Sequence, residues 1–501
     1  MTSSSSVDYA DIQGLVRFGY GALTEASFLL LRIRDTRTAR IWLSSAPISN
    51  AVALPQAPNT ALQVAFTCEG LRVLGLSENL LSGFSAEFYS GMSGDASRSR
   101  RLGDEGANSP EYWEWGGSEK IPHLVVMLYA RENQLNDWSK VVRGPQWEDA
   151  FDVLDSLPTS NLFGVEPFGF KDGISQPTVD WERRRQVGGD ELVYGNLVCL
   201  GEFLLGYPNE YGKYTDRPLL PISNQTSVLP AAEDHPELCD LGQNGTYLVF
   251  RQLDQDVRGF WQFMDRHANS DPRTRQELAE LLVGRQQNGD PLIELSQQPI
   301  AGIDSKDAAQ NQFTFDSDSK GLRCPLGAHI RRANPRTTDL PGASSNIFSK
   351  LKHTLGFNEN SFGEDVIAST RFHRLLRRGR EYGPALSISD ALQTARPDEA
   401  SRGIHFISLG ANISRQFEFV QNAWLMSSKF AGLTGESDPL LGNREPIQDG
   451  QATNAFFITQ KGAPKRCINA VPQFITVRGG AYFFLPGLRA LRFIAGDSRN
   501  L

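Results

Sequence analysis

Runs of apolar residues along this chain predict strands and helices that alternate through both halves. In the first half, β-prone runs at 26–34, 64–67 and 123–130 predict strands, and apolar residues at helical spacing predict helices over 36–43 and 69–76. In the second half the same criteria predict strands at 245–253, 403–409 and 481–486, and helices at 257–268, 274–284 and 417–426. This mixture favours an α+β protein built from two halves, each with an antiparallel sheet.

The length of 501 residues exceeds what a single hydrophobic core usually serves, and 40% of the residues are hydrophobic. We therefore expect two domains, at 8–220 and 240–501, joined by an ordered surface connection over 209–244. A further insertion at 337–370 is expected to lie at the rim of a functional site.

The charge balance of 50 Lys and Arg residues against 58 Asp and Glu residues gives −8, which provides no large positive field for nucleic acid or acidic membrane lipids. Five cysteines without a Cys-x-x-Cys pair favour neither a disulfide framework nor a thiolate metal site, and they fit a reducing compartment. The first residues lack a secretory signal, and no apolar run is long enough to span a bilayer. We expect a cytoplasmic protein. An unusual export route, packaging in a larger shell and assembly into a homo-oligomer would leave no mark in the sequence.

Three separate segments carry candidate chemistry. The string 169–177 (GFKDGISQP) places Asp172 between glycines in a tight turn, and the segment 324–336 (CPLGAHIRRANPR) holds His329 among basic residues. The turn 377–379 (RRG) follows and contributes Arg377. Gly-x-x-Asp-Gly by itself also describes an ordinary turn. An acid, a histidine and an arginine in this order, however, are the functional side chains of a haem peroxidase.

Several further motifs make the chain resemble the dye-decolorising peroxidases over nearly its whole length. The matching strings are DIQGL at 11–15, AFTCEGLRVLG at 65–75, LGD at 102–104, Gly-x-x-Asp-Gly at 169–173, GEFLLGY at 201–207, His329 with NPR at 334–336, and RRG at 377–379. The length and the insertion between His329 and Arg377 favour the longer branch of the family. The resemblance implies two ferredoxin-like domains, with antiparallel β-sheets flanked by helices, and haem b in the C-terminal half.

The resemblance also implies that His329 is the proximal ligand of the haem iron. A neutral imidazole nitrogen binds the iron, and the other ring nitrogen needs an acceptor that fixes its tautomer. Glu418 is one candidate acceptor, and a backbone carbonyl or an aspartate elsewhere is equally open, because Asn412 stands where the family often has an acid. The ordinary role of a surface or satisfied core residue is expected for His123, His353 and His405.

Haem carries two carboxylates, which call for guanidinium or amide partners when they are desolvated. Arg331 and Arg336 suit that role, whereas Arg332 is expected to be a solvated surface residue. By resemblance, the edge of the haem is lined by Gly173, Ile174, Ser175, Asn334, Pro335 and Arg336.

Cleavage of hydrogen peroxide needs a group that moves a proton between the two peroxide oxygens and a cation that stabilises the developing negative charge. We assign the first role to Asp172, as the distal acid and base, and the second to Arg377, with Arg378 supporting the turn. An unperturbed aspartate has a pKa of about 3.9 against about 6.5 for histidine, so the sequence predicts an acidic optimum.

The expected reaction couples reduction of hydrogen peroxide to oxidation of bulky organic reductants such as dyes and phenolics. A bulky donor would need a surface aromatic that relays an electron, for which Tyr112, Trp113, Trp115 and Tyr382 are candidates, although packing is the ordinary role of such residues. Two alternatives stay open. One is a haem carrier or iron-releasing protein with little peroxidase turnover, and the other is a non-haem binding or structural protein of the same shape.

Overall fold

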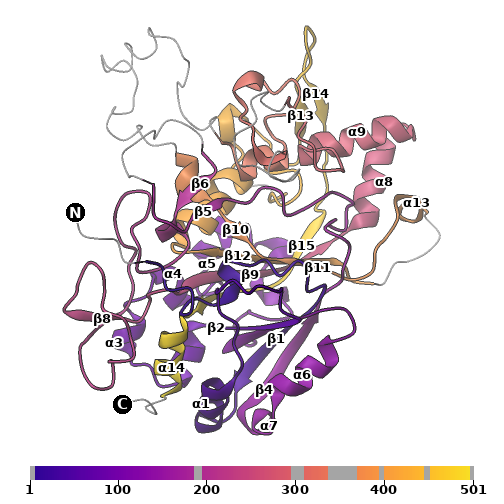
Figure 1. Cartoon of the computed structure of the whole chain (residues 1–501). Helices are drawn as coiled ribbons and strands as arrows, with labels where there is room; N and C mark the ends of the chain where they lie inside the picture. Colours follow the sequence, from indigo (N-terminus) through magenta and orange to yellow (C-terminus); the bar gives the residue numbers. More distant parts are fainter. Residues whose placement is uncertain are drawn as a thin grey trace, which may run out of the picture.

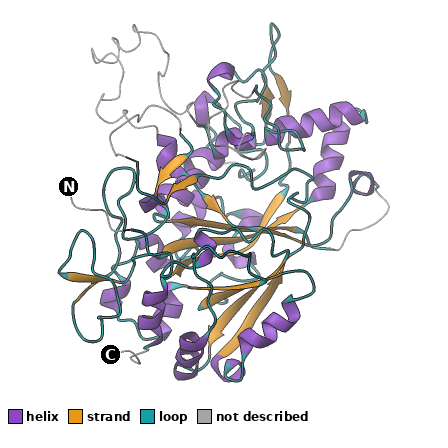
Figure 2. Ribbon diagram, viewed as in Figure 1, coloured by secondary structure: helices purple, strands orange, loops and turns teal. Residues whose placement is uncertain are grey.

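The computed structural model describes residues 6–185, 195–294, 310–336, 369–393, 400–444 and 452–496. The strands of the central sheet are β1 (Glu25–Ile33), β2 (Thr60–Phe66), β3 (Leu124–Ala130), β4 (Phe151–Pro158), β9 (Thr246–Gln255), β10 (Leu376–Arg377), β11 (Arg380–Tyr382), β12 (Gly403–Gly410) and β15 (Ile475–Leu485). Within these residues they form one nine-stranded antiparallel sheet in the order β10-β12-β9-β15-β2-β3-β1-β4, with β11 also paired to β12 (Figure 1). Figure 2 shows this sheet at the centre of the molecule, enclosed by helices and loops.

The sheet consists of an N-terminal and a C-terminal half that meet at a narrow seam. Strands β15 and β2 share a single paired position, Phe484 opposite Phe66, whereas β15 and β9 pair along most of their length. The prediction of a ferredoxin-like α+β fold is confirmed, with the two antiparallel sheets joined edge to edge. The division into domains at 8–220 and 240–501 stays a prediction.

Both faces of the sheet are buried, which explains why its strands appear as continuous apolar runs in the sequence. On β1, Leu29 and Leu31 join one core cluster, whereas Phe28 and Leu30 join a second cluster on the opposite face, as the two-residue period of a strand requires. The first cluster receives side chains from α1 (Thr36–Ser45), α2 (Cys68–Val73), α8 (Val257–His267), α9 (Pro272–Val283) and α14 (Leu488–Ala495).

Most predicted elements are confirmed to within a few residues. They are the strands at 26–34, 123–130, 245–253 and 403–409, and the helices at 36–43, 69–76, 257–268 and 274–284. The prediction at 417–426 is helical in the structure, but as π-helical turns at Ser414–Glu418 and Val420–Met426.

Two strand boundaries are wrong, and the long edge strand β4 and the short strands β10 and β11 of the central sheet were missed. Strand β2 begins at Thr60, because the polar Gln63 that interrupts its apolar pattern is buried and accepts a hydrogen bond from the backbone of Leu15 (3.0 Å). Strand β15 begins at Ile475. A bulge next to Gly479 interrupts the strand pattern, so the residues before the bulge were not predicted to belong to the strand. Strand β4 was not predicted because, as an edge strand, it fully buries a residue only near each end.

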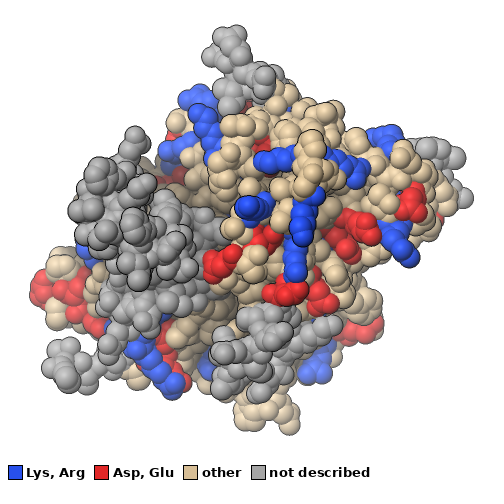
Figure 3. All heavy atoms as spheres, turned by 90° about the horizontal axis from the view of Figure 1, so that it is seen from above, with Lys and Arg blue, Asp and Glu red and all other residues tan. Residues whose placement is uncertain are grey.

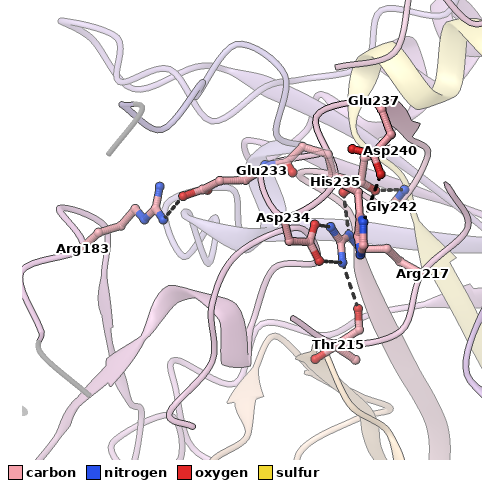
Figure 4. Close-up of polar contacts among 10 residues, drawn as sticks. Arg183, Thr215, Arg217, Glu233, Asp234, His235, Glu237, Asp240 and Gly242 are labelled. Atoms are coloured by element: carbon pink, nitrogen blue, oxygen red, sulfur yellow. Dashed lines mark hydrogen bonds and ion pairs between the residues drawn. The ribbon is translucent and has the colours of Figure 1, made fainter. Parts of the chain in front are cut away.

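The connection over 209–244 is ordered, as predicted. It contains the antiparallel pair β7 (Leu219–Pro221) and β8 (Leu238–Asp240), and buried Arg217 holds it together. The Arg217 guanidinium donates to Asp240 (2.5 Å) and to Asp234, as Figure 4 shows. Of the insertion predicted at 337–370, residues 337–368 lie outside the described residues.

No helix within the described ranges combines the length and apolar character that a membrane crossing requires. On the face of the molecule seen in Figure 3, basic and acidic side chains are interleaved, so neither sign forms a continuous patch there.

Candidate active site

A cavity of about 250 Å³ lies where the segment around Asp172 meets the C-terminal half of the chain. Its apolar walls include Phe168, Phe170, Val283, Phe406, Phe417 and Leu425. Its polar lining includes Asp172, Arg285, His329, Asn334 and Arg377. An apolar cavity with a few polar groups is the usual form of a cofactor site.

His329 is the first residue of the short helix α11 (His329–Ala333), and its imidazole faces the cavity. Its Nδ1 lies 3.0 Å and 3.1 Å from the two carboxylate oxygens of Asp438, a fully buried side chain. Burial lowers the pKa of His329, but the Asp438 carboxylate outweighs this effect, so the pKa is raised overall. With Nδ1–H donating to Asp438, the lone pair of Nε2 is left for a ligand.

Asp438, rather than Glu418, is thus the acceptor for His329. The carboxylate of Glu418 instead pairs with Arg98 Nε (2.9 Å) and accepts a hydrogen bond from Tyr482 (2.9 Å). Asn412 caps the following backbone by accepting from Arg415 N (2.8 Å). Asp438 lies 109 residues after His329 in a loop, and no local pattern in the sequence marks it.

Asp172 and Arg377 form an ion pair on the wall of the same cavity. Arg377 Nη1 donates to Asp172 Oδ1 at 2.7 Å, and the two side chains are 27% (Arg377) and 34% (Asp172) exposed. Burial raises the pKa of Asp172, but the charge and hydrogen bond of Arg377 outweigh it, so the pKa lies below its ordinary value. An ionised carboxylate beside a guanidinium can accept a proton and return it while the cation keeps its charge.

The backbone holds the Asp172 turn in place. Gly169 and Gly173 have φ of 99° and 80°, conformations that favour glycine, and Asp172 N donates to Gly164 O (3.0 Å). Just before the turn, the Glu166 carboxylate accepts from Phe168 N (3.0 Å) and Phe170 N (2.9 Å). Glu166 also lines the cavity, and burial raises its pKa to about 7. Sequence reasoning did not identify this residue.

Only some of the residues that were expected along the haem edge line the cavity. Ile174, Ser175 and Asn334 line the cavity, whereas Gly173 and Pro335 are not part of its wall.

The arginines after His329 point elsewhere. Arg331 donates to Asp318 Oδ2 (3.2 Å) and to Cys324 O (2.8 Å), and Arg336 donates to the carbonyl oxygens of Asn311 and Phe313 (2.8 Å and 2.9 Å). Arg332 was predicted to be solvated and is fully buried, because backbone carbonyls of the C-terminal half take up its donors. Neither Arg331 nor Arg336 belongs to the cavity wall.

The histidines expected to have ordinary roles behave accordingly where they are described. His123 Nδ1 accepts from Ile33 N (3.0 Å), and buried His405 Nε2 lies 3.1 Å from Pro158 O. His353 lies outside the described residues.

The candidate relay aromatics are mostly packing residues. Trp113 and Trp115 are buried, and Tyr382 stacks on His405 with ring centroids 4.4 Å apart. Tyr112 is exposed but does not line the cavity.

A different aromatic series leads from the surface to the cavity. The half-exposed Tyr211 stacks on Phe372 with centroids 4.1 Å apart and ring planes 3° from parallel. The ring centroids of Phe372 and His373 are 6.4 Å apart, and His373 lines the cavity. This series could not be predicted, because Tyr211 lies far from Phe372 and His373 in the sequence.

No protein-family model matches the chain, but the curated proteins and solved structures give a consistent answer. A multifunctional dye peroxidase of Amycolatopsis is 30% identical over 95% of this chain and 90% of its own length. The chain belongs to the dye-decolorising peroxidases. It is also 28% identical to a dye-decolorizing peroxidase of Mycetinis scorodonius, over 98% of this chain and 88% of that protein. The crystal structure of a DyP-type peroxidase from Auricularia auricula-judae has the same fold, with a TM-score of 0.71 and 24% identity over 99% of this chain and all of the other.

Dye-decolorising peroxidases are haem proteins that act on hydrogen peroxide, and the described residues fit a haem. The cavity offers an imidazole whose Nδ1 is already engaged, together with the apolar walls that a macrocycle requires. The buried Oδ1 of Asn334, on the same wall, has no hydrogen-bond partner among the described residues, which leaves it available to a bound group.

Proposed function

We propose that this protein uses haem b to reduce hydrogen peroxide and to oxidise bulky organic donors such as dyes and phenolics. The observation that carries the proposal is the meeting of two pairs, His329 with Asp438 and Asp172 with Arg377, in one cavity. A relative with the same fold has been crystallised in complex with 2,6-dimethoxyphenol, which supports a phenolic donor for this chain.

In this proposal His329 Nε2 binds the haem iron, and the apolar walls hold the macrocycle. Asp438 keeps the proton on Nδ1 and increases electron donation from the imidazole. When bound, haem supplies an iron centre that accepts oxidising equivalents from peroxide and passes them on one electron at a time.

Asp172 is proposed to move the proton that peroxide cleavage requires. Its carboxylate takes a proton from one peroxide oxygen and delivers it to the other, which leaves as water. Arg377, 2.7 Å from Asp172, stabilises the negative charge that develops during cleavage and keeps Asp172 ionised in mild acid. The structure therefore favours activity that extends below neutral pH.

Bulky donors are proposed to react at the surface, because a cavity of about 250 Å³ that also holds a macrocycle leaves no room for a dye. The stack of Tyr211 on Phe372, followed by His373 at the cavity, offers a route for an electron from such a donor.

A reducing compartment is proposed for this protein, and with it a cytoplasmic location. All five cysteines are free thiols, and four of them are buried.

The decisive experiment combines spectroscopy with three variants, of which one is a control. The wild type should show a Soret band, His329→Ala should lose the iron-ligated spectrum, and His235→Ala, at an exposed histidine outside the cavity, should keep it. Asp172→Asn should keep the band but lose roughly 10²- to 10⁴-fold in its rate with peroxide. A wild type without haem would refute the proposal. Normal peroxide turnover in Asp172→Asn would refute the role of Asp172, and negligible turnover in a haem-loaded wild type would favour the carrier alternative.

A further inference from the structure

Arg285 is a buried cation that faces the cavity. The residue is only 4% exposed. Its Nη1 donates to Gly289 O (2.8 Å) and Gln310 O (3.1 Å), and its Nη2 donates to Ser175 Oγ (3.1 Å). Every one of these acceptors is neutral. Among the described residues no carboxylate oxygen lies within 4.0 Å of the guanidinium nitrogens, although buried charges are ordinarily paired.

The surroundings of Arg285 carry an excess of positive charge. Burial, together with the nearby guanidinium groups of Arg336 and Arg377, lowers the pKa of Arg285 to about 9, against a smaller opposing effect of Asp290. Arg377 is itself matched by Asp172. A cation in this position is unfavourable in the empty protein and would be stabilised by an anion that enters the cavity.

The backbone fixes Arg285 between the two parts of the site. Gly284 ends helix α9 with φ of 95°, and a Cβ there would lie 2.6 Å from Ile330, on the helix of His329. The following turn packs against the Asp172 segment, because Lys171 N donates to Gln287 O (3.0 Å). A Cβ on Gly289 would lie 2.4 Å from Ile174. The guanidinium is therefore held in position before any ligand binds.

We propose that Arg285, together with the Ser175 hydroxyl, binds a carboxylate of the haem macrocycle. A guanidinium forms two parallel hydrogen bonds to a carboxylate, and preorganised donors lose little entropy on binding. Arg331, which the sequence favoured for this role, already has a carboxylate partner in Asp318 and no place on the cavity wall. This inference rests on the proposed haem site and adds how the site recognises the acidic edge of its ligand.

The test is a titration of the haem-free protein with iron protoporphyrin IX and with its dimethyl ester, which has no carboxylates. The wild type should bind the acid roughly 10- to 100-fold more tightly than the ester, the range expected for charge-assisted hydrogen bonds. Arg285→Gln should lower this ratio severalfold while leaving the affinity for the ester unchanged. Arg331→Gln is the matched control and should keep the wild-type ratio.

The thermal stability of the haem-free protein provides a second measurement that does not depend on activity. Because Arg285→Gln removes an unpaired buried charge, the melting temperature of its haem-free form should equal or exceed that of the wild type. Its haem-bound form should melt below the haem-bound wild type. A preserved acid-to-ester ratio in Arg285→Gln would overturn the inference and leave the proposed function standing. A wild type that binds neither macrocycle would overturn both.

Discussion

Replacing Asp438 with asparagine should disable His329 as a ligand through the position of a single proton. Both backbone donors at this site, Leu440 N (2.9 Å) and Leu441 N (2.8 Å), point at Oδ1 of Asp438. In the Asp438→Asn variant they will hold the amide oxygen of the new side chain in the same place. The amide NH₂ then takes the position of Oδ2, which lies 3.0 Å from His329 Nδ1.

An NH₂ group in this position opposes the hydrogen bond from Nδ1–H. If Nδ1 accepts from the NH₂ group, the proton of the neutral imidazole moves to Nε2 and the lone pair that binds iron is lost; if Nδ1 keeps its proton, it can donate only to the amide oxygen at the Oδ1 position, 3.1 Å away. Keeping the binding tautomer would place two donors against each other and forfeit a charge-assisted hydrogen bond of about 1.5–3 kcal/mol. This corresponds to a loss of roughly 10- to 150-fold in haem affinity. Mutating the hydrogen-bond partner of a metal-bound histidine has a similar effect in other proteins.

The assay is a haem titration of the purified Asp438→Asn variant, followed by its visible spectrum and by recovery with added imidazole. Asp318→Asn is a matched control, because Asp318 is also buried and accepts backbone hydrogen bonds from Leu322 and Cys324, but does not touch His329. The control should bind haem with wild-type ligation. An Asp438→Asn variant with undiminished affinity and an unchanged spectrum would refute the tautomer argument.

Three further predictions follow from the site. Arg377→Gln removes the largest effect that opposes burial at Asp172, so the pKa of Asp172 rises and the acidic limb of kcat/KM for peroxide should move to higher pH; a limb that stays in place contradicts the pairing. Tyr211→Phe should slow oxidation of a bulky dye severalfold and leave a small phenol unaffected, whereas equal losses would argue against a surface route. Gly284→Ala should lower the free energy of unfolding, measured by chemical denaturation, by about 2–5 kcal/mol. Adding Ile330→Ala to this variant should recover part of the loss, and a double variant without any recovery would argue against a clash with Ile330.

The three residues with the clearest chemistry could be predicted because each lies in a compact local motif. Asp172 sits in a glycine-flanked turn, His329 begins a short helix after a segment that contains proline and glycine, and Arg377 belongs to an RRG turn. Strands β1, β3, β9 and β12 could be predicted for a similar reason, since burial on both faces leaves an apolar run that needs no knowledge of the fold.

Partners that are distant in the sequence could not be predicted. Asp438 reaches His329 from a loop, and Arg285 reaches the cavity from the end of α9, so only the folded chain shows these contacts. The failure at Arg331 and Arg332 has a related cause. From sequence alone, a charged residue is expected to face solvent or to bind a ligand. The side chains of Arg331 and Arg332 are instead buried, and their N–H groups donate to oxygens of the protein itself.

A contact between the Asp172 segment and strand β10 also determines the geometry of the Asp172–Arg377 pair. The side chain of Gln176, four residues after Asp172, accepts from Arg377 N (3.0 Å) and donates to Arg377 O (3.1 Å). Two hydrogen bonds from one amide thus fix β10 relative to the Asp172 turn. In the proposed function, proton transfer and charge stabilisation both depend on this relative position, so the Gln176 amide would align the acid with its cation before any substrate arrives.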